Sequence, residues 1–109
     1  MAGTEWLQTA VDDLLSHDLS RVRQQPPLRP IGVTIRQLID AYFARYEPGQ
    51  PLPGQAVRPG GDLPSDVRIT RVTIGRTGGP YRVFFRYTPK ENLFEIWRIG
   101  YPRGDRLRP

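Results

Sequence analysis

Two short segments near the C-terminal end restrict the fold of this chain more than any other feature. Residues 81–87 and 93–99 are rich in aromatic and β-branched side chains, and residues 88–92, which include a proline and an asparagine, separate them. Aromatic and branched residues favour strands, whereas Pro and Asn favour turns. The pattern therefore predicts a β-hairpin of two antiparallel strands.

Pairing Thr88 with Leu93 fixes the two faces of this hairpin, because side chains alternate along a strand. On one face we expect three cross-strand pairs: Arg86 with Glu95, Phe84 with Trp97, and Arg82 with Ile99. The other face is almost wholly apolar: Tyr81, Val83, Phe85, Tyr87, Phe94 and Ile96. We expect helices to cover the apolar face. The opposite face mixes cations with flat rings, a mixture that suits nucleic acid.

Length and composition narrow the class of protein. A chain of 109 residues predicts a single domain, 1–109, with one core. The absence of cysteine excludes disulfides, thiolate metal sites and a cysteine nucleophile. No apolar run reaches the roughly 18 residues that a membrane helix needs, and the N-terminus lacks the pattern of a secretory signal. We expect a cytoplasmic protein with no membrane partner.

The charge of the chain is distributed unevenly. Residues 1–67 carry a net charge of −2, whereas residues 68–109 carry +7, and arginine outnumbers lysine 15 to 1. Guanidinium groups bind phosphate in a bidentate way and stack on rings, so this bias favours a polyanionic partner. Genomic composition can also replace lysine with arginine, but it does not explain why the positive charge lies in one third of the chain.

A pair of helices is expected within residues 4–46. Residues 5–23 form an amphipathic pattern after a candidate N-cap, Thr4. Its apolar stripe is Trp6, Leu7, Ala10, Val11, Leu14 and Leu15. A second helix follows a spacing typical of a capping box, Thr34 with Gln37, and ends before Pro48. The apolar stripe of this helix is Ile35, Leu38, Ile39, Tyr42, Phe43 and Tyr46.

The remainder of the chain predicts a long loop and then a sheet. Residues 47–66 contain five prolines and four glycines, which favours a surface loop. Residues 67–76 look extended, but their apolar residues change parity, which predicts a bulge near Thr70-Arg71 or a strand that begins only at Arg71. With the hairpin, this gives a sheet within 67–100 and a basic tail at 101–109. The expected fold is α+β, with two N-terminal helices on one face of a small antiparallel sheet.

This order of elements, together with the sequence R-V-T-I-G-R-T-G-G-P-Y-R-V-F-F-R-Y at 71–87, resembles the RelE and ParE toxin superfamily. The resemblance covers residues 67–104 in detail: a basic strand, a glycine-containing turn, a strand that begins with Tyr-Arg, and a last strand that ends near a glycine and a basic cluster. The sequence offers no counterpart, ahead of Thr4, of the first strand of the family.

The resemblance implies a function and a set of residues. Ribonuclease members of the family cut messenger RNA on the ribosome without a metal or another cofactor. By position, Arg82 matches the phosphate-stabilising arginine, Arg71 and Arg76 supply further cations, and Arg103 follows the last strand. Tyr101 is a possible stand-in for the terminal acid/base residue. Arg86, Trp97 and Arg98 are further nucleic-acid-binding candidates.

Other interpretations stay open. The alternative to the RNA hypothesis is a non-enzymatic module that binds a protein: an antitoxin, a topoisomerase as in the ParE branch, or a larger complex. Arg86 and Glu95 can form an ordinary cross-strand pair, worth well under about 1 kcal/mol. The Pro-rich loop can cover Trp97, and His17 is expected to be solvated or to cap a helix. Neither carboxylates nor histidine are spaced like metal ligands.

Overall fold

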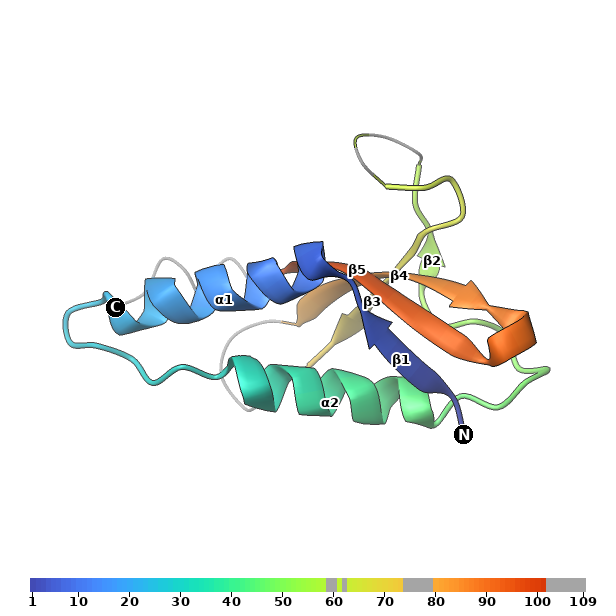
Figure 1. Ribbon diagram of the computed structural model, residues 1–109, viewed down its shortest axis with the longest axis horizontal. Helices are drawn as coiled ribbons and strands as arrows, with labels where there is room; N and C mark the ends of the chain where they lie inside the picture. Colours follow the sequence, from blue (N-terminus) through green and yellow to red (C-terminus); the bar gives the residue numbers. More distant parts are fainter. Residues whose placement is uncertain (59–60, 62, 74–79, 102–109) are drawn as a thin grey trace.

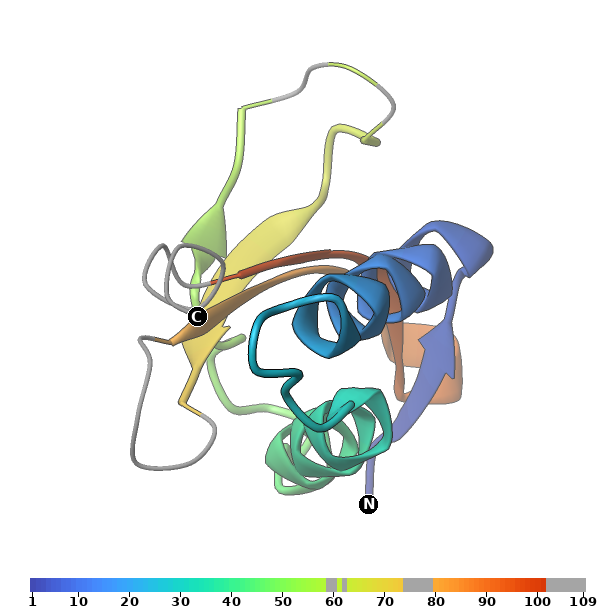
Figure 2. The ribbon, with the colours of Figure 1, turned by 90° about the vertical axis from the view of Figure 1, so that its left-hand side faces the viewer.

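The computed structural model describes residues 1–58, 61, 63–73 and 80–101. Its elements are β1 (Gly3–Trp6), α1 (Gln8–Val22), α2 (Gly32–Ala44), β2 (Gln55–Ala56), β3 (Arg68–Val72), β4 (Tyr81–Thr88), a 3₁₀ turn (Pro89–Glu91) and β5 (Leu93–Gly100). The strands form one sheet in the order β1-β5-β4-β3-β2 (Figure 1). Figure 2 shows both helices on one side of the sheet. The predicted α+β class is confirmed.

The N-terminus differs from the prediction. Residues 3–6 form a strand that pairs with β5 in parallel, and α1 begins only at Gln8, after Leu7 as N-cap. The predicted helical start at residue 5, the Thr4 cap and the lack of a first strand are therefore wrong. A contact between residues distant in the sequence explains the difference. One carboxylate oxygen of Asp40 on α2 accepts hydrogen bonds from Thr4 Oγ1 (2.7 Å) and Trp6 Nε1 (2.8 Å).

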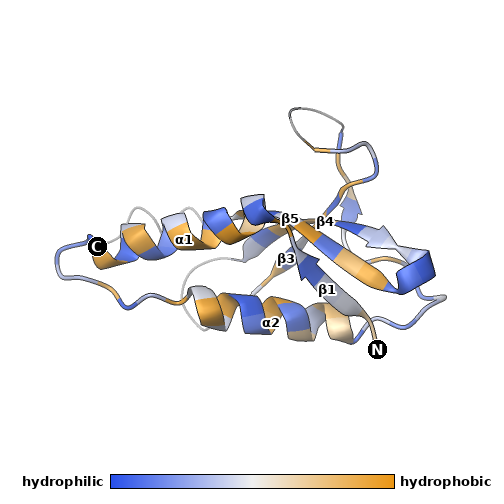
Figure 3. Ribbon diagram, viewed as in Figure 1, coloured by the Kyte–Doolittle hydropathy of each residue, from blue (hydrophilic) through white to orange (hydrophobic). Residues whose placement is uncertain are grey.

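The core lies between the two helices and the sheet. It buries Ala10, Leu14, Ile35, Ile39 and Phe43 of the helices. The strands contribute Val72, Tyr81, Val83, Phe85, Phe94, Ile96 and Ile99. Figure 3 shows the corresponding alternation of hydrophobic and hydrophilic residues along both helices. Two members of the predicted stripes, Leu15 and Leu38, are instead exposed.

The second helix begins two residues before the predicted capping box. The main-chain N–H groups of Ile31 and Gly32 donate to Asp18 Oδ1 at 2.8 and 2.9 Å. A carboxylate on α1 thus satisfies the first N–H groups of α2, where the helix dipole also favours negative charge. The cap comes from a different helix, so the capping box predicted from Thr34 and Gln37 is wrong.

The segment predicted as a long loop contains β2 and is tied to β3 by Arg68. The Arg68 guanidinium donates to the carbonyl oxygens of Pro53 (3.2 Å), Leu52 (3.4 Å) and Gly54 (2.8 Å). Farther along, residues 57–58 and 63–66 project from the sheet on the side away from α2 (Figure 2).

β3 is regular and begins at Arg68, so the predicted bulge at Thr70-Arg71 and the alternative strand start at Arg71 are both wrong. The pairing of β3 with β4 runs without a shift from Arg68 to Val72. The parity change has another cause: Thr70 occupies a buried position and its hydroxyl lies 2.9 Å from the hydroxyl of Tyr42 on α2. A hydrogen-bonded polar side chain thus occupies a core position of β3.

The predicted pairing of the hairpin strands is confirmed near the turn and is wrong at the end far from the turn. Thr88 pairs with Leu93 and Arg86 with Glu95, as predicted. An irregularity between Phe84 and Phe85 then leaves Trp97 as an extra residue, and the following pairs become Phe84 with Arg98, Val83 with Ile99, and Arg82 with Gly100. A β-bulge moves later side chains to the opposite face. Ile99 consequently enters the core instead of facing Arg82.

Candidate nucleic-acid interface

Arg71 and Arg82 lie directly opposite each other on adjacent strands. Both are exposed on the face away from the helices, since the neighbours of Arg82 in β4, Tyr81 and Val83, are buried. Within the described part of the chain, neither arginine forms a hydrogen bond or an ion pair with a carboxylate. Like charges directly opposite each other destabilise a sheet. Two adjacent guanidinium groups with no acidic partner among the described residues are chemically suited to an anion.

Gly100 provides space for the Arg82 side chain. A Cβ atom at position 100 would lie 3.0 Å from both Nε and Nη2 of Arg82. The guanidinium therefore extends across β5, where any side chain would crowd it. The two cations together span the outer face from β3 to β5.

An apolar pair lies beside the two arginines. Ile69 and Phe84 face each other on β3 and β4, two residues from Arg71 and Arg82, so they share the same face of the sheet. Both are half-buried. Rings next to guanidinium groups are typical of single-stranded nucleic-acid sites, where bases stack on aromatic side chains. The predicted mixture of cations and rings is present, with Phe84 as its ring.

Arg86 is on the same face but is neutralised. Its Nε lies 3.1 Å from Asp66 Oδ2 and 4.0 Å from Glu95 Oε1. The ordinary cross-strand pairing considered for Arg86 is thus present, and a second carboxylate from the long loop strengthens it. No sequence pattern marks Asp66 as a partner of Arg86, since 20 positions separate them.

Arg98 is also engaged by a carboxylate. It makes a bidentate contact with Asp13 of α1, with Nε 2.9 Å from Oδ2 and Nη2 3.1 Å from Oδ1. The main-chain N–H of Ile99 donates to the same Oδ2 at 2.9 Å. This carboxylate links α1 to the end of β5 and removes Arg98 from the set of uncompensated cations.

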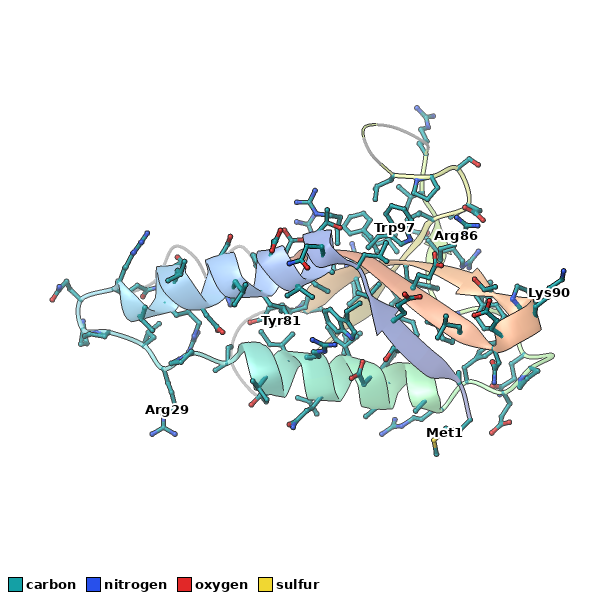
Figure 4. The ribbon with its side chains drawn as sticks, in the orientation of Figure 1. Met1, Arg29, Tyr81, Arg86, Lys90 and Trp97 are labelled. Atoms are coloured by element: carbon teal, nitrogen blue, oxygen red, sulfur yellow. The ribbon has the colours of Figure 1, made fainter. Side chains whose placement is uncertain are left out.

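Trp97 is the extra residue of the bulge and is half-buried. Its Nε1 donates to Glu95 Oε1 at 3.3 Å, and its carbonyl accepts from Thr9 Oγ1 at 2.6 Å. Figure 4 shows Trp97 and Arg86 near the base of the projecting loop, and their shared partner Glu95 confirms that they are neighbours. Trp97 therefore lies at the end of the outer face that carries Glu95 and Asp66, apart from the Arg71–Arg82 pair.

Tyr101 lies on the side of α1. Its ring stacks on His17 of α1, with centroids 4.0 Å apart and planes 13° apart. The Nε2 atom of buried His17 lies 3.2 Å from the Tyr81 hydroxyl, so the expectation that His17 is solvated is wrong. Burial, reinforced by Asp13, Tyr81 and Asp18, raises the pKa of Tyr101 well above its usual range. The structure does not bring Tyr101 together with Arg82.

Two of the predicted site residues, Arg76 and Arg103, lie outside the described residues. In the part of the chain that is described, no group of three histidine or acidic side chains is placed to hold a metal ion. None of the described helices is long and apolar enough to cross a membrane.

Comparison with solved structures gives the fold. The chain matches a chain in the crystal structure of the toxin–antitoxin complex RelBE2 from Mycobacterium tuberculosis with a TM-score of 0.56 and 20% sequence identity, covering 93% of each chain. No family model and no curated protein matches the sequence. The resemblance to RelE-type toxins is thus shown at the level of the fold.

Proposed function

We propose that this chain binds RNA through the Arg71–Arg82 pair and that its outer face is that of a RelE-type, metal-independent endoribonuclease. The observation that supports the proposal is the direct opposition of two exposed arginines without a described acidic partner. Such a pair costs stability unless an anion lies between the guanidinium groups. A phosphate group fits, because each guanidinium can donate two hydrogen bonds to phosphoryl oxygens.

In the cleavage reaction, the ribose 2′-hydroxyl loses its proton and its oxygen attacks the adjacent phosphorus, while the bond from phosphorus to the 5′-oxygen breaks and that oxygen takes up a proton. Negative charge develops on the phosphoryl oxygens during this step. Arg71 and Arg82 would stabilise this charge. Proton transfer needs a further group. We assign this proton transfer to Tyr101, with Arg103 as an additional cation. Tyr101 can act in this way only if its ring leaves the stack on His17.

Binding is tested by Arg82→Ala with Arg45→Ala as the matched control, because Arg45 is an exposed arginine that directly follows α2. We expect Arg82→Ala to weaken binding of a single-stranded RNA and to lower the slope of log affinity against log salt by about 0.7. Arg45→Ala should leave both unchanged. Fluorescence anisotropy at several salt concentrations measures the effect, and thermal melts verify that both variants fold. Equal losses in the two variants would contradict the proposed site.

Cleavage is tested separately with RNA in the presence and absence of ribosomes. Cleavage that Arg82→Ala abolishes would support the enzymatic form of the proposal. Folded protein that binds RNA but never cuts it would leave only the binding function.

A protein partner, such as an antitoxin, is the second candidate. Leu15, Leu19 and Val22 form an exposed apolar row on α1, and Val33 of α2, which is 73% exposed, lines a shallow hollow together with Leu15. These residues fall at helical spacing, so they share one face of α1. If the chain works in this way, affinity capture should recover a stoichiometric protein that resists nuclease treatment, and Leu19→Glu should release it.

A further inference from the structure

A polar hollow of about 420 Å³ opens beside Arg71 at the end of β2. Its lining residues are Gly54, Gln55, Ile69, Thr70 and Arg71. The volume is within the range of small-ligand sites. One wall is a member of the proposed anion-binding pair, so a ligand in the hollow would lie next to a phosphate bound there.

The hollow exists because the pairing of β2 with β3 stops early. Val57 N–H donates to the Val67 carbonyl (3.1 Å), and Gln55 pairs with Ile69. Hydrogen-bonded pairs in an antiparallel ladder recur every two residues, so the next would join position 53 to position 71.

Position 53 cannot make that pair. Pro53 has no N–H to donate, and its carbonyl accepts from the Arg68 guanidinium instead. The chain turns away at Gly54, whose φ is +72° and where a Cβ atom would lie 2.0 Å from the Ile69 carbonyl oxygen. The main-chain N–H and C=O of Arg71 are left on an open edge of the sheet.

The groups around the hollow match the edge and face of a nucleobase. Gln55 and Ile69 are a cross-strand pair, so they share the outer face with Arg71. Ile69 offers an apolar floor. The Gln55 side chain is exposed, and its amide makes no hydrogen bond to any described residue. It therefore has both a donor and an acceptor available.

We propose that this hollow is a nucleobase subsite and that Gln55 determines base preference. A phosphate between Arg71 and Arg82 places its adjoining base over Ile69, and the Gln55 amide hydrogen-bonds the base edge. A glutamine amide pairs in a bidentate way with N6 and N7 of adenine, so the subsite selects adenine in single-stranded RNA. This inference rests on the proposed RNA-binding function.

The test measures binding of three eight-nucleotide RNAs, oligo(A), oligo(C) and oligo(U), by fluorescence anisotropy. We expect the protein to bind oligo(A) about tenfold more tightly than the other two, which is the discrimination typical of one bidentate base contact. Gln55→Ala, and Gln55→Met, which keeps the length of the side chain without the amide, should reduce this ratio to about twofold or less. The oligo(U) affinity and its salt slope should not change. Gln37→Ala is the matched control, an exposed glutamine on α2.

The outcomes separate the inference from the function on which it rests. Salt-dependent binding that requires Arg82 but shows no base preference would overturn the adenine subsite and leave RNA binding intact. A preference that survives both Gln55 variants would also overturn it. Absence of binding to all three RNAs would overturn the proposed function itself. Binding of an extended peptide at the open β3 edge, in place of RNA, would do the same.

Discussion

The hydroxyl of Tyr101 is buried and has no hydrogen-bond partner among the described residues. Its pKa is raised by burial, so the folded protein holds the phenol proton at a pH where the unfolded chain releases it. The contribution of the protonated phenol to the free energy of unfolding is therefore complete below about pH 10, the ordinary pKa of a phenol. It decreases as the pH rises from there toward the higher pKa that Tyr101 has in the folded protein.

We expect Tyr101→Phe to make that alkaline loss of stability shallower. At pH 7 the variant should be as stable as the parent within about 0.5 kcal/mol, because it removes only an unpaired hydroxyl. Tyr81→Phe is the contrast, since it deletes the contact with His17 (3.2 Å) and should cost about 0.5–1.5 kcal/mol. Urea unfolding at pH 7 and at pH 10–11 measures both. A larger loss for Tyr101→Phe at pH 7 would show that its hydroxyl is satisfied in solution.

The junction between the two helices depends on one carboxylate and one missing side chain. Asp18 Oδ1 accepts the N–H groups of Ile31 and Gly32, and a Cβ atom at position 32 would lie 2.6 Å from Asp18 Oδ2. Asp18→Ala should cost about 1–2 kcal/mol as the loss of an N-cap. Gly32→Ala should be destabilising alone but clearly less so when Asp18 is already Ala, because the clash is then absent. Denaturant unfolding of the four proteins in this cycle gives the coupling, and additive costs would contradict the packing.

The elements that sequence patterns predict well are those set by local periodicity. The hairpin and its turn register follow from alternation and from Pro89 and Asn92, and the second helix follows from its apolar stripe. β1 could not be predicted in this way, because Asp40, more than 30 residues away, holds Thr4 and Trp6. The bulge at Trp97 has no local signal either, yet it decides that Ile99 is core and that Arg98 reaches Asp13.

The same distinction applies to the candidate site. The resemblance to the RelE and ParE family predicts Arg71 and Arg82 as site residues, and in the structure they lie directly opposite each other. The sequence does not predict that Arg98 pairs with Asp13 or that Arg86 pairs with Asp66, because these carboxylates come from a helix and a loop that are distant along the chain. The net charge of +7 in residues 68–109 therefore overstates the uncompensated charge on the outer face.

The charge of the whole outer face gives the last prediction. It is divided between a basic end at Arg71 and Arg82 and an end where Asp66 and Glu95 flank Arg86. Asp66→Asn should free Arg86 in part, raise RNA affinity, and steepen the salt slope by up to about 0.7. Stability should change by less than about 1 kcal/mol, because the Asp66 side chain is 61% exposed.

Glu47→Gln, an exposed acid that follows α2, is the control for the Asp66 variant, because it changes the net charge of the molecule by the same amount. Salt titrations of RNA binding compare the two variants with the parent. A gain in Asp66→Asn alone would mean that the carboxylate acts locally, by occupying a guanidinium that RNA phosphate would otherwise bind. Glu47→Gln should change RNA affinity little, because exposed charges separated by more than a Debye length, about 8–10 Å at physiological salt, are largely screened. Equal gains in the two variants would instead mean that the overall charge matters and the contact between Asp66 and Arg86 does not. Arg86 would then have no role in the interface.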